Sequence, residues 1–166
     1  MTVVLVAGTT ETARIPGLSA AGSEPSAMAV TPTADAEILL DGELIAAPAV
    51  PVSPTGCPTP ALVTRAVREL DSFDARVLEA GLQTEPQVSS RTLTEEPGGD
   101  LRTSTPVPDA DAIWERARAV GANITDERVY IGETIPGGTT TALGVARSLG
   151  VDLTVSSSLP TNPLER

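Results

Sequence analysis

One short apolar run limits the possible folds of this chain more than any other segment: residues 2–8, with the sequence TVVLVAG. Most of these side chains are β-branched, apolar residues would lie on both faces of a strand, and the run ends at Gly8. A strand that is apolar on both faces is typical of a parallel sheet covered by helices on each side. The run therefore predicts a buried parallel strand.

Strand-like and helix-like segments then alternate along the chain. Further strands are expected at residues 34–40, 75–80, 128–131 and 151–155. Helices are expected at residues 60–70, where Thr59-Pro60 is a typical start, after Asp109, and from Thr139 or Thr140 to Leu149. Residues 46–60 are rich in proline and residues 83–108 are polar, so both are expected to be loops. The alternation predicts an α/β fold with a mainly parallel sheet.

Composition excludes several kinds of chemistry. All 11 basic residues are arginine, and the sequence contains no His and a single Cys, Cys57. A Ser-His-Asp triad, a P-loop lysine, a His-based metal site and an internal disulfide are therefore excluded, and no cofactor is expected. The 22 acidic residues give a net charge of −11, which argues against binding to nucleic acid.

The apolar content points to a folded protein outside the membrane. No apolar run approaches the length of a membrane span, and residues 2–8 lack the basic region of a signal peptide. A cytoplasmic protein is expected. The acidic and Thr-rich composition, with Arg in place of Lys, indicates a halophilic cytoplasm, and a GC-rich genome is the alternative cause of the Arg bias.

The segment at residues 131–141, IGETIPGGTTT, carries the sharpest chemical signal. It follows a predicted strand and opens a predicted helix, so backbone amides there could hold a phosphate. Gly138 stands where a P-loop has its lysine, which excludes that motif. The alternative is an ordinary tight turn. Glu133 within the segment could act as a base or bind a ribose hydroxyl. Alternatively, its negative charge could simply interact with the positive end of the helix dipole.

Four segments together resemble a known enzyme family. Residues 15–22, 56–61, 132–141 and 156–160 are similar, in this order, to the archaeal branch of the nicotinate-nucleotide:dimethylbenzimidazole phosphoribosyltransferases. The resemblance implies a Rossmann-like three-layer α/β fold. It also implies transfer of phosphoribose from nicotinate mononucleotide to a benzimidazole-type base, which supplies the lower ligand of cobalamin.

The resemblance also assigns roles to residues. Glu133 is expected to be catalytic, and phosphate or substrate would be bound by Gly132, Gly137, Gly138, Thr139, Thr140, Ser19, Gly22, Ser156 and Ser157. Family members are longer, so residues 1–166 are expected to be the N-terminal part of such a domain. The family's base near the C-terminus and its lysine have no counterpart here. A non-catalytic nucleotide-binding module and one part of a split enzyme are therefore alternatives.

Two further expectations concern packing. Cys57 has neither a His nor a nearby Arg in sequence to activate it, so a buried packing role is expected, and Trp114 on the apolar face of a helix is expected in the core. A sheet that stops early leaves an open edge, which self-association or a complementary C-terminal chain would cover.

Overall fold

The computed structural model describes residues 1–19, 21 and 25–155. Four strands, four α-helices and one short 3-10 helix follow one another in this part of the chain. The strands are β1 (Thr2–Ala7), β2 (Asp74–Ala80), β3 (Ser90–Thr94) and β4 (Val129–Thr134). The helices are η1 (Glu11–Arg14), α1 (Pro25–Leu40), α2 (Ala61–Leu70), α3 (Ala110–Gly121) and α4 (Gly138–Ser148).

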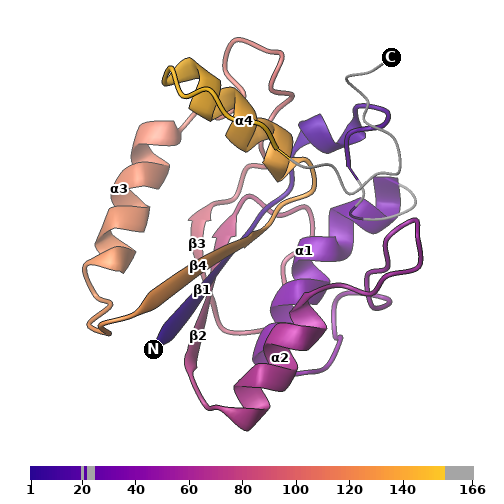
Figure 1. Cartoon of the computed structure of the whole chain (residues 1–166), viewed down its shortest axis with the longest axis vertical. Helices are drawn as coiled ribbons and strands as arrows, with labels where there is room; N and C mark the ends of the chain where they lie inside the picture. The colour runs from indigo at the N-terminus through magenta and orange to yellow at the C-terminus, as the bar shows by residue number, and fades with distance from the viewer. Residues whose placement is uncertain (20, 22–24, 156–166) are drawn as a thin grey trace.

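The strands form one all-parallel sheet with the order β3-β2-β1-β4 (Figure 1). The run at residues 2–8 forms the central strand β1, which pairs with β2 on one side and with β4 on the other. All four strands therefore end at the same edge of the sheet, where the loops that follow β1 and β4 meet. The fold is Rossmann-like α/β, as the sequence predicts.

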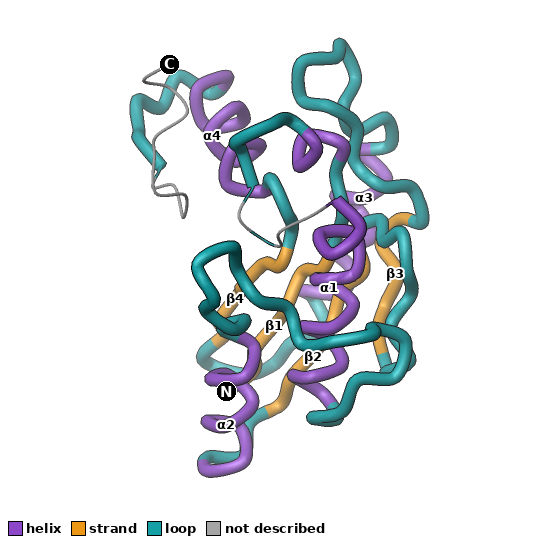
Figure 2. The backbone as a smooth tube through the Cα atoms, turned by 90° about the vertical axis from the view of Figure 1, so that its right-hand side faces the viewer, coloured by secondary structure: helices purple, strands orange, loops and turns teal. Residues whose placement is uncertain are grey.

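Helices cover both faces of the sheet, which makes three layers (Figures 1 and 2). On one face, Val4, Leu78 and Leu93 pack against Val120 and Ile113 of α3. On the other face, Ala7, Val77 and Leu82 pack against Ala36 and Leu40 of α1, and α2 packs on α1. Helix α4 lies beyond the carboxyl ends of the strands (Figure 1).

The expected strand at residues 34–40 is wrong, because this segment is the second half of α1. A short apolar run does not by itself distinguish a buried strand from a buried helix. Small side chains favour the helix here, since Ala34 and Ala36 are fully buried and let α1 approach the sheet closely. The buried acidic residues Asp35 and Glu37 alternate with these alanines in sequence. This alternation of polar and apolar residues is also the pattern of a strand.

Two further expectations about secondary structure are wrong. The segment at residues 83–108 contains β3, a polar edge strand in which only Leu93 is buried. The strand was not recognised because its sequence is mostly polar. At the edge of the sheet, one buried side chain, that of Leu93, packs against the core and most of the others face solvent. Residues 151–155 form no strand, and Val151 and Val155 are exposed. The apolar pattern there meets no neighbouring strand in the described part of the chain.

Trp114 does not lie in the core, since 70% of its surface is exposed. Helix α3 turns Ile113, Ala117 and Val120 towards the sheet. One residue along a helix rotates a side chain by about 100°, so Trp114 lies beside this stripe and faces outward. Among the described residues, no helix has the length and apolar content needed to cross a membrane.

Candidate functional site

A glycine-containing turn between β4 and α4 forms the centre of the candidate site. The amide of Gly138 donates to the carbonyl of Ile135 at 2.7 Å, and Gly137 adopts a left-handed conformation with φ = 79°. A β-carbon at Gly137 would lie only 2.9 Å from the backbone nitrogen of Ala13. The turn therefore needs glycine for its conformation and for its close approach to η1.

The loop after β1 supports this turn from the other side. Thr10 caps η1 through its hydroxyl oxygen, which accepts from the amide of Thr12 at 3.1 Å. The buried Thr12 hydroxyl in turn accepts from the amide of Leu101 at 3.0 Å. Helix α4 packs against η1. These contacts fix the beginning of α4 relative to the end of β1.

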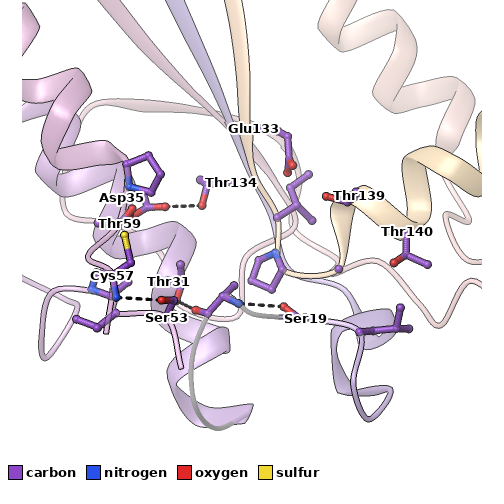
Figure 3. Close-up of a pocket in the computed structure, with 18 of the residues that line it drawn as sticks. Ser19, Thr31, Asp35, Ser53, Cys57, Thr59, Glu133, Thr134, Thr139 and Thr140 are labelled. Carbon is purple, nitrogen blue, oxygen red and sulfur yellow. Dashed lines mark hydrogen bonds between the residues drawn. The ribbon is translucent and has the colours of Figure 1, made fainter. Parts of the chain in front are cut away.

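Side-chain hydroxyl groups surround a cavity of about 570 Å³ in front of the turn (Figure 3). We call it the hydroxyl-lined cavity; the hydroxyl side chains in its wall are those of Ser19, Thr31, Ser53, Thr55, Thr59, Thr134, Thr139 and Thr140. They come from the loop after β1, from the last residue of β4, from α1, from the proline-rich loop and from the first turn of α4. Groups far apart in sequence thus gather at the carboxyl ends of the strands, where parallel α/β sheets bind ligands.

The start of α4 can bind an anion in this cavity. The first amides of a helix have no partner within the helix, and the helix dipole favours negative charge there. Thr139 and Thr140 belong to this first turn, and both line the cavity. Their amides and hydroxyls provide the kind of donors that hold a phosphate group without lysine.

Asp35 is a buried carboxylate in the wall of the same cavity. It accepts from the Thr59 hydroxyl at 2.7 Å and from the Thr134 hydroxyl at 2.6 Å (Figure 3). Burial raises the pKa of the Asp35 carboxyl above its ordinary value, and the two hydroxyl donors lower it in part. Asp35 thus joins α1, the proline-rich loop and the end of β4 at one point.

Glu133 lies next to Thr134 on β4 but points away from Asp35 (Figure 3). Its carboxyl group lies against the turn, so that a β-carbon on Gly138 would come within 2.8 Å of Oε2. Partial burial raises the pKa of this carboxyl, although the amide of Ile135 donates to it and opposes the shift. A carboxyl with a raised pKa can exchange a proton closer to neutral pH than an ordinary glutamate.

A second cavity, of about 660 Å³, meets the first at Glu133 and Ile135. We call it the apolar cavity, because its wall is dominated by the side chains of Pro97, Leu101, Pro106, Val107, Ile113, Ala142, Val145, Leu149 and Leu153. Glu133 lines both cavities. The Glu133 carboxylate is therefore shared by a cavity that offers hydroxyl groups among apolar side chains and by a cavity that is almost wholly apolar.

The structure brings together part of the predicted set. Ser19, Glu133, Gly137, Thr139 and Thr140 line the hydroxyl-lined cavity, and Gly138 lines the apolar cavity together with Glu133. Gly132 lies within β4 and is in the wall of neither cavity. Gly22, Ser156 and Ser157 are outside the described residues.

Three residues of the site were missed from sequence: Asp35, Thr59 as its hydrogen-bond partner, and Thr134. Asp35 was assigned to a strand, and only the packing of α1 on the sheet brings it to the cavity. An acidic residue between two alanines in an apolar run is the signal that could have found it, because buried carboxylates need partners and such sites are often functional.

Cys57 does not have the buried position that the sequence suggested. It is exposed in the proline-rich loop, at the rim of the hydroxyl-lined cavity, where its amide donates to the Ser53 hydroxyl at 3.0 Å. The amide of Ser53 donates to the carbonyl of Cys57 at 2.8 Å, so that Cys57 lies on a short surface turn and its thiol is exposed. In residues 1–19, 21 and 25–155, no three Cys, Asp or Glu side chains come together as a metal site.

Fold and site together define a Rossmann-like α/β protein with a glycine-containing turn at the start of α4 and two adjoining cavities. No family model matches the chain. The chain is similar to archaeal proteins named UPF0284. A relative from Halobacterium salinarum is 53% identical over 160 residues, and the match covers 96% of this chain and 48% of the relative.

Further relatives come from other archaea. A UPF0284 protein of Methanothermobacter thermautotrophicus is 40% identical over 167 residues, covering 96% of this chain and 46% of the relative. One from Pyrococcus furiosus is 41% identical over 165 residues, covering 98% of this chain and 50% of the relative. The chain thus spans about half the length of the curated relatives it matches. The names of these relatives state no reaction.

Proposed function

We propose that the chain is the N-terminal part of a phosphoribosyltransferase that moves phosphoribose from nicotinate mononucleotide to a benzimidazole-type base. The observation that carries this proposal is the position of Glu133 between two cavities of different character. A transferase of this kind needs a polar site for a phosphorylated sugar, an apolar site for a flat acceptor, and a proton acceptor between them. The resemblance of residues 132–141 to the family's phosphate loop agrees with this arrangement.

The hydroxyl-lined cavity would hold the donor nucleotide. Its 5′-phosphate would lie at the start of α4, against the amides and hydroxyls of Thr139 and Thr140. The hydroxyl groups of Ser19 and Ser53 lie in the same wall and can bind the sugar. The chain carries no lysine, so backbone dipoles and threonine hydroxyls supply most of the attraction for the phosphate.

Glu133 would act on the acceptor base. During transfer, the bond between ribose C1′ and the nicotinate nitrogen breaks, and nicotinate leaves with the bonding electron pair. The unprotonated ring nitrogen of the benzimidazole forms the new bond to C1′, and the other ring nitrogen loses its proton to the Glu133 carboxylate, which leaves a neutral base on the sugar. The negative charge of that carboxylate would also stabilise the positive charge that develops on the sugar ring.

A second candidate is a nucleotide-binding module without activity of its own, or one part of a split enzyme. The observation that favours it is the length of the chain, which spans about half of its relatives. Both candidates require nucleotide binding at the turn, and they differ only in turnover.

Calorimetry in molar KCl tests the binding step. Nicotinate mononucleotide should bind the wild-type chain at least about tenfold more tightly than the riboside that lacks the phosphate, which corresponds to about 1.4 kcal/mol. Gly138→Asp should abolish binding, because it adds a carboxylate beside Glu133 and the phosphate. Thr140→Ala should weaken binding, and Thr64→Ala on α2, outside both cavities, is the matched control. Equal affinity for the two ligands would contradict phosphate binding at this turn.

A further inference from the structure

The outer edge of β4 is open in the described part of the chain. One side of β4 pairs with β1 over all six residues, and no described strand pairs with its other side. In a parallel ladder, alternate residues direct their N–H and C=O groups to opposite sides. The amide of Thr2 donates to the carbonyl of Arg128, and that of Gly8 donates to Thr134. The even-numbered residues of β4 thus face β1.

It follows that Val129, Ile131 and Glu133 present their backbone groups at the open edge. A parallel strand placed there could take up three N–H and three C=O groups without disturbing the pairing with β1. The backbone N–H and C=O groups of these three residues are therefore available to extend the sheet, because the existing sheet does not use them.

The side chains of β4 are also uncovered. Ile131 is in register with Val4 on the same face of the sheet, yet 75% of Ile131 is exposed and only 4% of Val4. Tyr130, on the opposite face, is 53% exposed. Both helix layers thus cover β1 but leave residues 129–133 of β4 exposed, and α1 reaches β4 at Thr134, the last residue of the strand. A strand alone would not bury these side chains, so the missing cover includes helices.

Helix α2 carries a second set of exposed apolar side chains. It lies on the β4 side of α1 in Figure 2 and presents Val63, Val67 and Leu70 to solvent at helical spacing. Three apolar residues at positions i, i+4 and i+7 form one stripe, which normally packs against another element. The stripe on α2 and the open edge of β4 are thus two exposed apolar features on the same side of α1, and we call them together the β4-side surface.

We propose that this surface binds a polypeptide equivalent to the half of the archaeal relatives that the chain does not match, and that this partner adds a parallel strand to β4. The strand order β3-β2-β1-β4 is the beginning of the doubly wound order, in which the next parallel strand lies beyond β4. The relatives are about twice as long as the matched region, so they contain enough chain for that strand and its covering helices.

Hydrogen exchange on a co-expressed pair tests the proposal. The chain is expressed with a polypeptide spanning the unmatched half of the Halobacterium salinarum relative, and is purified in molar KCl. The expected result is a one-to-one complex in which the amides of Val129, Ile131 and Glu133 exchange more slowly than in the chain alone. The even-numbered amides of β4 should change little, because they already pair with β1.

Two variants separate edge pairing from general association. Ile131→Pro removes one outward N–H without removing a hydrogen bond to β1, and it should weaken the complex at least about tenfold. Ile131→Val keeps the N–H and should bind like wild type, with circular dichroism checking that each variant folds. Absence of a complex, unchanged exchange at the three amides, or a self-dimer that protects them in the chain alone would overturn the proposal.

Discussion

Replacing Gly137 by alanine tests whether the turn that begins α4 is as tightly determined as the structure indicates. Gly137 has φ = 79°, and a β-carbon there would lie 2.9 Å from the nitrogen and 3.1 Å from the Cα of Ala13. The left-handed conformation costs an L-residue about 1–2 kcal/mol. Relief of the backbone contact adds a further cost of about 1–3 kcal/mol. Gly137→Ala should therefore lower the free energy of unfolding by about 3 kcal/mol.

Two other glycines separate these contributions. Gly150 has φ = 77°, but a β-carbon added there would meet nothing within 4 Å, so Gly150→Ala should cost only the conformational part, about 1 kcal/mol. Gly132 lies in β4 without a positive φ and also has open space, so Gly132→Ala should change stability by less than about 0.5 kcal/mol. The three variants thus form a graded series.

Urea unfolding in molar KCl, followed by circular dichroism, measures the series. Calorimetry with nicotinate mononucleotide measures the consequence for the site, where Gly137→Ala should weaken binding and Gly150→Ala should not. Equal destabilisation by Gly137→Ala and Gly150→Ala would refute the close contact with η1. A large effect of Gly132→Ala would refute the open space around its Cα.

Three further predictions concern buried carboxylates and salt. Burial raises the pKa of Asp35 above 3.8, so the contribution of this carboxyl to stability is present at low pH and is lost as the pH rises through the folded pKa. In urea unfolding at several pH values, Asp35→Asn should therefore lose less stability than the wild type as the pH rises. Parallel pH curves for the two proteins would contradict this. Burial raises the pKa of Glu37, but four backbone amides that donate to its carboxylate lower the pKa more, so its contribution to stability is lost as the pH falls. Glu37→Gln should lower the free energy of unfolding by about 1–3 kcal/mol at neutral pH, whereas Glu43→Gln, at an exposed position, should leave it unchanged. A net charge of −11 predicts that stability rises as KCl increases from about 0.1 to 1 M, and salt-independent unfolding would exclude a charge-based salt requirement.

Local sequence signals predicted much of the fold. The two-sided apolar run at β1, the helical spacing of α2 and α3, and the glycine stop after α4 each carry their structural cause within a few residues. The turn between β4 and α4 was predictable for the same reason, since glycine and threonine after a strand are typical of the start of a helix. Predictions of this kind depend little on tertiary contacts.

Other features depend on contacts that sequence does not display. Residues 34–40 form a helix because Ala34 and Ala36 fit closely against the sheet, and Asp35 enters the site only through its bonds to Thr59 and Thr134. The strand β3 is stable because β2 offers it an edge, while its own sequence is mostly polar. The apolar cavity likewise arises where α3, α4 and the loop at residues 95–109 meet, which no single segment encodes.

Release of nicotinate from nicotinate mononucleotide is the most direct test of the proposed function. The chain, together with the unmatched half of the Halobacterium salinarum relative, is incubated with nicotinate mononucleotide and a benzimidazole in molar KCl. The proposal predicts that free nicotinate and a benzimidazole riboside phosphate appear in equal amounts, and that Glu133→Gln lowers the rate by about 10²–10⁴. A folded complex that binds the nucleotide but forms neither product, or an unchanged rate in Glu133→Gln, would contradict the assigned catalytic role.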